Sequence, residues 1–381
     1  MVLPPNKVGI PVAIALGVFF SPAVTAMPLS ADTGEEVRRA TRRGSTELFA
    51  DRVIRQRTRN YRETLLTVFD EWLQANRFIS LDALLDAKPI DAETVAGALT
   101  DFGREMCYAG KPYGRFSETI NAVAGRRPAI RKALVQAWDL AFAWQADEPR
   151  EHHPAMPLSV LLAICSLALL WGWPHEAAVF ALTWAGILRI GETIAATRGD
   201  LILPCDAAPG TTYALLRILQ PKTRGRLAKH QSARIDPIDI IRLLTAVYKN
   251  YNSETKLWNF SSTTLRRRLN HLLRALGLPV EKAPGVVPFD LGSFRPGGAT
   301  FYLQLFEDSE LVRRRGRWVS VRVLEIYLQE ISTATFHARL SGEARRRVGE
   351  LSKSFPYLLD QAESWLLAGI PPIAWKHLWS S

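Results

Sequence analysis

The sequence predicts a mainly α-helical protein in which a small all-helical domain precedes an α+β domain with a small sheet and a β-hairpin. From Tyr61 onward, apolar residues recur at spacings of three and four, which is the periodicity of amphipathic helices. The polar, proline-bounded stretch 147–154 then separates two helical regions, as an inter-domain linker does. Further on, two short runs of β type, 211–219 and 231–236, are joined by a basic turn.

Length and composition fit this organisation. At 381 residues the chain can hold two or three domains, and its 48% hydrophobic and 22% charged residues are ordinary for a folded protein. We divide it into a signal-like or unassigned N-terminal segment (1–30), a charged linker (31–60), a helical domain (61–147), a mixed α+β domain (155–340) and a C-terminal helical tail (341–381).

The two most apolar stretches follow the predicted linker, at 157–173 and 177–188. The first is slightly short for a membrane span, and Gly172 and Pro174 end it. We therefore expect both stretches to form buried core helices. In the linker itself, adjacent His152 and His153 are interpreted as part of a solvated loop rather than as a metal pair.

The first thirty residues resemble a secretory signal peptide. Lys7, the apolar stretch 8–20 and Val24-Thr25-Ala26 supply its three regions. A mispredicted start and an organellar presequence are the alternatives, and a secreted or membrane protein is one of the function classes left open.

The charge and the cysteines limit the partners. The chain has 48 Lys and Arg against 37 Asp and Glu, a net charge of +11. This excess suits a polyanion such as nucleic acid, although a merely basic soluble protein would share it. Cys107, Cys165 and Cys205 are widely spaced and include no C-x-x-C pattern, which argues against a disulfide framework or a zinc site.

Two segments in the first half of the α+β domain carry side chains suited to binding a phosphate. Arg189 follows an apolar helix, and Glu192 lies three residues later, where it can hold the guanidinium in place. Lys222 lies in the turn of the predicted hairpin, from which a mobile cation can reach a ligand.

Two further segments follow. Arg295 precedes Pro296, which suits the first turn of a helix, so Arg295 is expected at a helix N-terminus that itself attracts anions. Trp318 and Tyr327 come next. Taken alone, these two aromatic residues would be interpreted as core positions of packed helices.

In this order, the four segments resemble the conserved boxes of the tyrosine-recombinase (phage-integrase) family, in its Cre-like, eukaryotic mobile-element-derived form. The resemblance covers roughly 157–330 and rests on Leu188-Arg189-Ile190-Gly191-Glu192, Pro221-Lys222-Thr223, the Arg295 segment, and the spacing of Trp318 and Tyr327 after it. It implies a core-binding domain that clamps DNA, followed by a catalytic domain. The catalytic residues that it implies are Arg189, Lys222, Arg295, Trp318 and Tyr327.

The resemblance also implies a reaction. Tyr327 would attack a DNA phosphodiester and form a 3′-phosphotyrosine link, so rejoining needs no ATP, metal or other cofactor. Fixed guanidinium groups would stabilise the charge that develops on the phosphate. Lys222 would protonate the leaving 5′-oxygen, Trp318 would donate its indole N–H, and Glu192 would support the arginines. The implied partner is double-stranded DNA, bound by a homo-oligomer, usually a tetramer on paired sites, in the nucleus, with no small-molecule substrate.

One position departs from the family pattern. Members usually carry histidine, sometimes lysine or tyrosine, three residues before the second arginine, whereas this chain has Gly292. Loss of a general acid or base typically costs about 10²–10⁴-fold in rate. A catalytically impaired DNA-binding protein, domesticated from a mobile element, is therefore the alternative. His230 is a candidate substitute, although an ordinary surface histidine is the favoured interpretation. A type IB topoisomerase shares the chemistry but fits the chain length and Trp318 less well.

Basic residues near these boxes are expected to contact DNA phosphates, although a solvated helix face is the alternative for the cluster at 313–317. The residues in question are Arg224, Arg226, Arg313, Arg314, Arg315 and Arg317.

Overall fold

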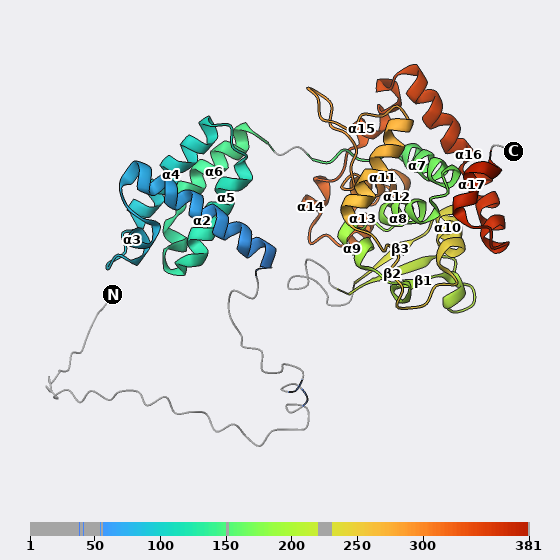
Figure 1. Cartoon of the computed structure of the whole chain (residues 1–381), viewed down its shortest axis with the longest axis horizontal. Helices are drawn as coiled ribbons and strands as arrows, with labels where there is room; N and C mark the ends of the chain where they lie inside the picture. The colour runs from blue at the N-terminus through green and yellow to red at the C-terminus, as the bar shows by residue number, and fades with distance from the viewer. Residues whose placement is uncertain are drawn as a thin grey trace, which may run out of the picture. The chain divides into compact units, whose positions relative to one another are not determined.

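A computed structural model describes residues 38, 41, 54, 56–149, 152–219 and 231–379, and the chain divides into two compact units, Met1–Pro149 and Arg150–Ser381 (Figure 1). Helices dominate both units, and the second also holds a three-stranded antiparallel sheet. The predicted fold class, mainly α with a small sheet, is confirmed. Among the helices of the described ranges, none combines the length and hydropathy of a bilayer-crossing segment.

The first unit is a helical bundle around an aromatic core. Its helices are α2 (Gln56–Arg77), α3 (Leu81–Asp86), α4 (Ala92–Tyr108), α5 (Tyr113–Arg126), the 3₁₀ turn η2 (Pro128–Ala133) and α6 (Val135–Asp147). The Asp91 side chain begins α4 by accepting hydrogen bonds from the backbone N–H groups of Glu93 and Thr94. Phe69 and Phe116 are fully buried between the helices.

Two glycines of α4 provide a test of how closely this bundle is packed. A Cβ added at Gly103 would lie 2.4 Å from the Phe116 ring of α5, whereas one added at Gly97 has open space. We expect Gly103→Ala to destabilise the fold by about 1–3 kcal/mol through overpacking. Gly97→Ala, the matched control, is expected to stabilise it by about 0.5–1 kcal/mol. Urea unfolding measures both, and equal effects of the two changes would contradict the close packing of α4 on α5.

The second unit is built around two buried helices, α7 (Leu158–Leu170) and α8 (Pro174–Ala185). Every residue of α8 except His175 is buried, which explains why its sequence is apolar on all sides. The remaining helices are α9 (Ile190–Ala195), α10 (Ile238–Tyr248), α11 (Ser262–Ala275), α12 (Phe294–Phe306), α13 (Ser309–Gly316), α14 (Val321–Glu325), α15 (Glu330–Ala334), α16 (Gly342–Leu367) and α17 (Pro372–Leu378), with the 3₁₀ turns η3 (Arg198–Asp200), η4 (Pro204–Asp206) and η5 (His337–Arg339).

The sheet lies beside this helical core and has the strand order β1 (Leu201–Ile202), β2 (Ala214–Ile218), β3 (Gln231–Ile235). Side chains of β2 alternate between the core and the surface, and Leu216 pairs with Ala233 of β3. The two predicted strands are present. Strand β1 was not predicted, because two residues are too few to show an alternating pattern.

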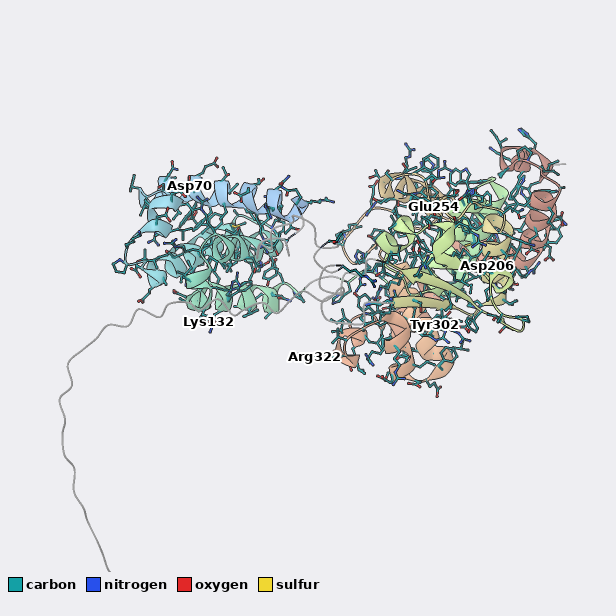
Figure 2. All side chains as sticks on the ribbon, turned by 90° about the horizontal axis from the view of Figure 1, so that it is seen from below. Asp70, Lys132, Asp206, Glu254, Tyr302 and Arg322 are labelled. Carbon is teal, nitrogen blue, oxygen red and sulfur yellow. The ribbon has the colours of Figure 1, made fainter. Side chains whose placement is uncertain are left out.

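A buried arginine fastens β1 to the helices. Arg198 donates hydrogen bonds to the carbonyl oxygens of Leu201 (2.7 Å) and Tyr248 (2.9 Å) and to the carboxylate of Asp206 (2.9 Å), which is labelled in Figure 2. Three acceptors on three segments fix the position of the first strand.

The C-terminal helices belong to the core of the second unit. Helix α16 packs along α7, where the Ser166 hydroxyl donates to the Leu351 carbonyl oxygen (2.8 Å). Phe355, Leu359 and Trp375 are almost completely buried. In Figure 1, α16 and α17 (red) lie against the same body as α7 and α10.

Candidate active site

The first component of the site is the turn between α8 and α9, where Arg189 precedes the first residue of α9. Glu192 folds back on this turn. One of its carboxylate oxygens accepts from the Arg189 backbone N–H (3.0 Å), and the other accepts from the Arg189 guanidinium (2.8 Å). The carboxylate thus holds the arginine from both ends, the arrangement that the spacing of the two residues predicts.

Two more guanidinium groups reach the same carboxylate. Arg317, which follows α13 in a left-handed conformation (φ 57°), places Nη2 3.0 Å from Glu192 Oε2. Arg295, in the first turn of α12, places Nη1 3.9 Å from that oxygen. Three positive charges therefore surround one carboxylate. The cluster keeps an excess of positive charge, and the side chains of Arg295, Arg317 and Glu192 are all nearly buried.

Burial and charge act on the pKa values in opposite directions. Burial alone would raise the pKa of the Glu192 carboxyl, but Arg317, the Arg189 N–H and Arg295 together hold that pKa below its ordinary value. Burial, with repulsion from Arg189 and Arg317, lowers the pKa of Arg295 to about 9. Arg295 is still charged at neutral pH, so the excess positive charge persists there.

Arg295 is only partly satisfied by the protein. Its Nη2 donates to the Gly316 carbonyl oxygen (2.6 Å), while its Nε and Nη1 are buried without a hydrogen-bond partner among the described residues. The indole nitrogen of Trp318 is likewise buried without a hydrogen-bond partner among the described residues. The centroid of the Trp318 ring lies 4.6 Å from the Arg295 guanidinium carbon. Buried donors are nearly always paired in folded proteins. Unpaired donors beside excess positive charge are typical of a site that an anion completes.

Tyr327 borders this cluster just after α14. Its ring centroid is 5.0 Å from that of Trp318 and 5.6 Å from the Arg295 guanidinium carbon. The backbone fixes the residue, because its N–H donates to the Leu324 carbonyl oxygen (2.8 Å) and its carbonyl accepts from the Thr300 hydroxyl (3.4 Å). The side chain is half-buried, and its hydroxyl makes no hydrogen bond to the parts of the chain that the structure describes. It is thus a fixed phenol with an uncommitted oxygen.

No family profile and no curated sequence matches the chain. Among solved structures, the Tn1549 transposon integrase in complex with transposon right end DNA aligns at a TM-score of 0.51 and 12% identity, over 79% of this chain and 96% of that one. The chain has the tyrosine-recombinase fold. The chain is also similar to the XerH site-specific recombinase bound to a difH substrate, with a TM-score of 0.48 and 14% identity over 72% of this chain and 78% of that one. A lambda integrase dimer bound to a core site aligns with a TM-score of 0.43 and 15% identity, over 78% of this chain and 86% of that one.

Within the tyrosine-recombinase fold, the structure brings together four of the five predicted catalytic residues. Arg189 and Arg295 meet at Glu192, and Trp318 and Tyr327 lie beside Arg295, all from separate segments of the second unit. Lys222 lies outside the described residues, as do Arg224, Arg226 and His230. Arg317, predicted only as a DNA contact, is an additional member of the cluster. Nothing in its sequence context distinguishes it from the neighbouring arginines.

The basic cluster at 313–317 differs from the surface strip that the sequence suggests. Arg313 donates to both Glu310 oxygens (2.6 and 2.7 Å) and to the Trp318 carbonyl oxygen (2.6 Å). Arg315 pairs with Asp236 and lies over the rings of Tyr302 (labelled in Figure 2) and Phe306. Arg317 is buried.

Only Arg314 of this cluster is largely exposed, at 73% of its side chain, and it also pairs with Glu310 (2.9 Å). The cluster is therefore not a continuous exposed strip, and contact of these arginines with DNA stays a prediction. Arg313 and Arg317 donate to carbonyl oxygens of the segment that carries Trp318.

The Gly292 position is filled in an unexpected way. A Cβ added to Gly292 would lie 2.7 Å from the imidazole of His153, so that ring occupies the space of the missing side chain. His153 in turn makes a 2.9 Å contact through Nδ1 with Asp290 Oδ1. The sequence interpretation of His153 as part of a solvated loop missed this contact, because no local pattern reports a pairing between segments so far apart in the chain.

Proposed function

We propose that the chain cuts and rejoins DNA strands through a covalent 3′-phosphotyrosine intermediate on Tyr327, as an enzyme of site-specific recombination or integration. The observation that carries this proposal is the cluster of Arg189, Arg295 and Arg317 beside the ring of Tyr327. Its Arg295 and Trp318 donors have no partner among the described residues. A cluster of positive charge and buried donors that adjoins a nucleophile fits attack on a phosphodiester.

The reaction follows from these positions. The Tyr327 oxygen loses its proton and forms a bond to phosphorus, the bond from phosphorus to the 5′-oxygen breaks, and that oxygen takes up a proton. Negative charge on the non-bridging oxygens is stabilised by Arg189 and Arg295, with Glu192 fixing the orientation of both. Lys222 is the proposed proton donor, by resemblance to the family. Attack by the free 5′-hydroxyl reverses the steps and restores the strand.

Double-stranded DNA is the proposed partner. The net charge of +11 favours a polyanion, and the integrase with the similar fold is bound to transposon DNA. We propose assembly as a homo-oligomer, by family analogy a tetramer on paired sites, and a nuclear location. A reporter fused to residues 1–30 tests the location, since export of the reporter would contradict it.

Covalent trapping tests the proposed reaction. The protein is incubated with a nicked suicide duplex whose cleaved end diffuses away, and the expected product is a protein–DNA adduct that survives denaturation. Digestion and mass spectrometry should place the nucleotide on the peptide that contains Tyr327. An adduct on a different residue would contradict the assignment.

Gly292 favours a second candidate, a DNA-binding protein of the same fold that has lost catalysis. In that case the duplex is retarded in a gel and no adduct forms at any pH. The same incubation distinguishes the two functions.

The Arg295 side chain supports a prediction of its own. Arg295→Lys is expected to slow adduct formation by about 10²–10³-fold, the typical effect of losing one transition-state donor. The three N–H donors of an ammonium group share one nitrogen, whereas the guanidinium uses separate nitrogens, so that Nη2 can donate to the Gly316 carbonyl oxygen while Nε and Nη1 stay available to a phosphate. Rates of adduct formation under single-turnover conditions measure the effect. Lys249→Arg, on the surface after α10, is the control and should leave the rate unchanged.

A further inference from the structure

The space beside Gly292 is occupied by an imidazole from another segment. Three atoms of the His153 ring (Cγ, Cδ2 and Cε1) lie 2.7, 2.7 and 2.8 Å from the position of a Cβ at Gly292. Such nearly equal distances mean that the ring presents its face to this Cβ position. Any residue with a side chain at 292 would displace His153.

We infer the direction of position 292 from the conformation of the backbone beside it. Ser293, between them, has helical dihedrals (φ −74°, ψ −21°), and its carbonyl oxygen accepts from the Gly297 N–H (3.1 Å). The backbone therefore follows a helical path before α12 formally begins, and residues three apart on such a path share a face. A group that fills the side-chain position of Gly292 thus lies on the face that carries Arg295.

His153 is held in place from two sides. Its Nδ1 lies 2.9 Å from Asp290 Oδ1, and this same oxygen accepts from the Gly292 backbone N–H (2.8 Å). On the other side, Gln329 donates to the His153 carbonyl oxygen (2.8 Å) and accepts from the Ala155 N–H (3.0 Å). Because Gln329 follows Tyr327 by two residues, the segment around His153 is attached both to the start of α12 and to the segment of the nucleophile.

The second ring nitrogen remains available. A carboxylate can only accept, so Nδ1 carries the proton shared with Asp290 and the carboxylate fixes the ring orientation. Nε2 makes no hydrogen bond within the described ranges, and the side chain is 61% exposed. This is the arrangement of an oriented imidazole that presents one nitrogen to a ligand.

We propose that His153 is a catalytic residue, which supplies through Nε2 the hydrogen bond to a non-bridging oxygen of the scissile phosphate that a glycine at 292 cannot make. This inference rests on the proposed function. It assigns a role to Gly292 as well, since only glycine leaves room for the ring. In this proposal the imidazole that family members usually carry at the position of Gly292 comes instead from His153, and Asp290 positions it.

The charges around His153 favour its donor form. The hydrogen bond to Asp290 raises the pKa of the imidazole, while partial burial and the nearby cations Arg266 and Lys282 act against this; the net direction is upward. The imidazolium therefore persists to a higher pH than for an ordinary histidine. Because the donor form is lost as pH rises through the raised pKa, the rate of adduct formation should decrease on the alkaline side.

The proposal is tested with single and combined substitutions at positions 153 and 292 of the full chain, using the suicide duplex. His153→Ala is expected to reduce the rate of adduct formation by about 10²–10³-fold, with DNA retardation preserved, whereas His152→Ala, the adjacent control, should leave the rate unchanged. Gly292→His alone should also be slow, because its Cβ displaces the His153 ring. Combining Gly292→His with His153→Ala returns a histidine to the same space and should raise the rate at least about 10-fold above that of His153→Ala.

The outcomes separate this inference from the proposed function. If the wild-type chain forms no adduct, the proposed function is lost and the role of His153 with it. If the wild-type chain forms an adduct and His153→Ala forms it at the same rate, only the inference is overturned. It is overturned as well if the double variant is no faster than His153→Ala.

Discussion

Tyr327→Phe is expected to abolish the covalent adduct with DNA while leaving DNA retardation and thermal unfolding close to those of the wild-type chain. The hydroxyl makes no hydrogen bond within the described ranges, so its removal leaves no partner unsatisfied. The ring contacts with Trp318 (5.0 Å) and Arg295 (5.6 Å) are preserved in phenylalanine. The variant therefore lacks the nucleophile but keeps almost all of the contacts that stabilise the fold.

Tyr357→Phe provides the matched control. Tyr357 lies on α16 with 62% exposure, and the same chemical change there should alter neither the adduct nor the unfolding temperature. An adduct that forms at an undiminished rate in Tyr327→Phe would place the nucleophile elsewhere. A large drop in the unfolding temperature of that variant would instead show that the phenol has a structural role.

Glu192→Ala is expected to have the largest effect on stability, a loss of about 3–5 kcal/mol, because it leaves buried positive charge without compensation. The carboxylate contacts Arg189, Arg295 and Arg317, and its side chain is only 7% exposed. Without it, the guanidinium groups repel each other in a poorly solvated space. Urea unfolding measures the loss, and adduct formation should disappear with it.

A surface carboxylate gives the comparison. Glu343 also pairs with two arginines, Arg346 and Arg347, but all three side chains are about half exposed. Glu343→Ala should therefore cause no measurable change, since exposed ion pairs contribute little. Equal effects of the two glutamate variants would contradict the central role of Glu192.

The pH dependence of stability follows from the same carboxylate. Folding lowers the pKa of Glu192, so its contribution is complete above the ordinary value of 4.5 and is lost as pH falls through the lowered value. In Glu192→Gln this part of the acid-induced destabilisation should be missing. The test is to measure the midpoint of urea unfolding for the wild-type chain and for Glu192→Gln, at neutral pH and at a pH below the ordinary glutamate pKa.

The parts of the site that the sequence predicts are those with a local signature. Arg189 and Glu192 are three residues apart on one turn, and Arg295 precedes a proline in the first turn of a helix. Their chemistry is therefore visible in short windows of sequence. Likewise, the apolar runs of α7 and α8 predict buried helices. These features depend on neighbours in the chain, and the structure places all of them in the second unit.

The parts that the sequence does not predict depend on contacts between distant segments. Arg317 looks like its exposed neighbour Arg314, and only the left-handed turn after α13 directs it inward to Glu192. His153 belongs to a polar stretch typical of a loop, and its partner Asp290 lies far along the chain. A single sequence carries no signal for such pairings, because the residues involved have ordinary alternatives on the surface.

The packing of the last helices has a consequence for how the protein is made. Helix α16 covers α7, and Trp375 of α17 is fully buried in the same core. Because the chain is synthesised from its N-terminus, the apolar faces of α7 and α8 cannot be covered until residues 342–378 have been synthesised. The first unit, whose helices all precede residue 149, can fold long before that. The second unit is thus the part of the chain whose apolar surface is exposed longest during synthesis.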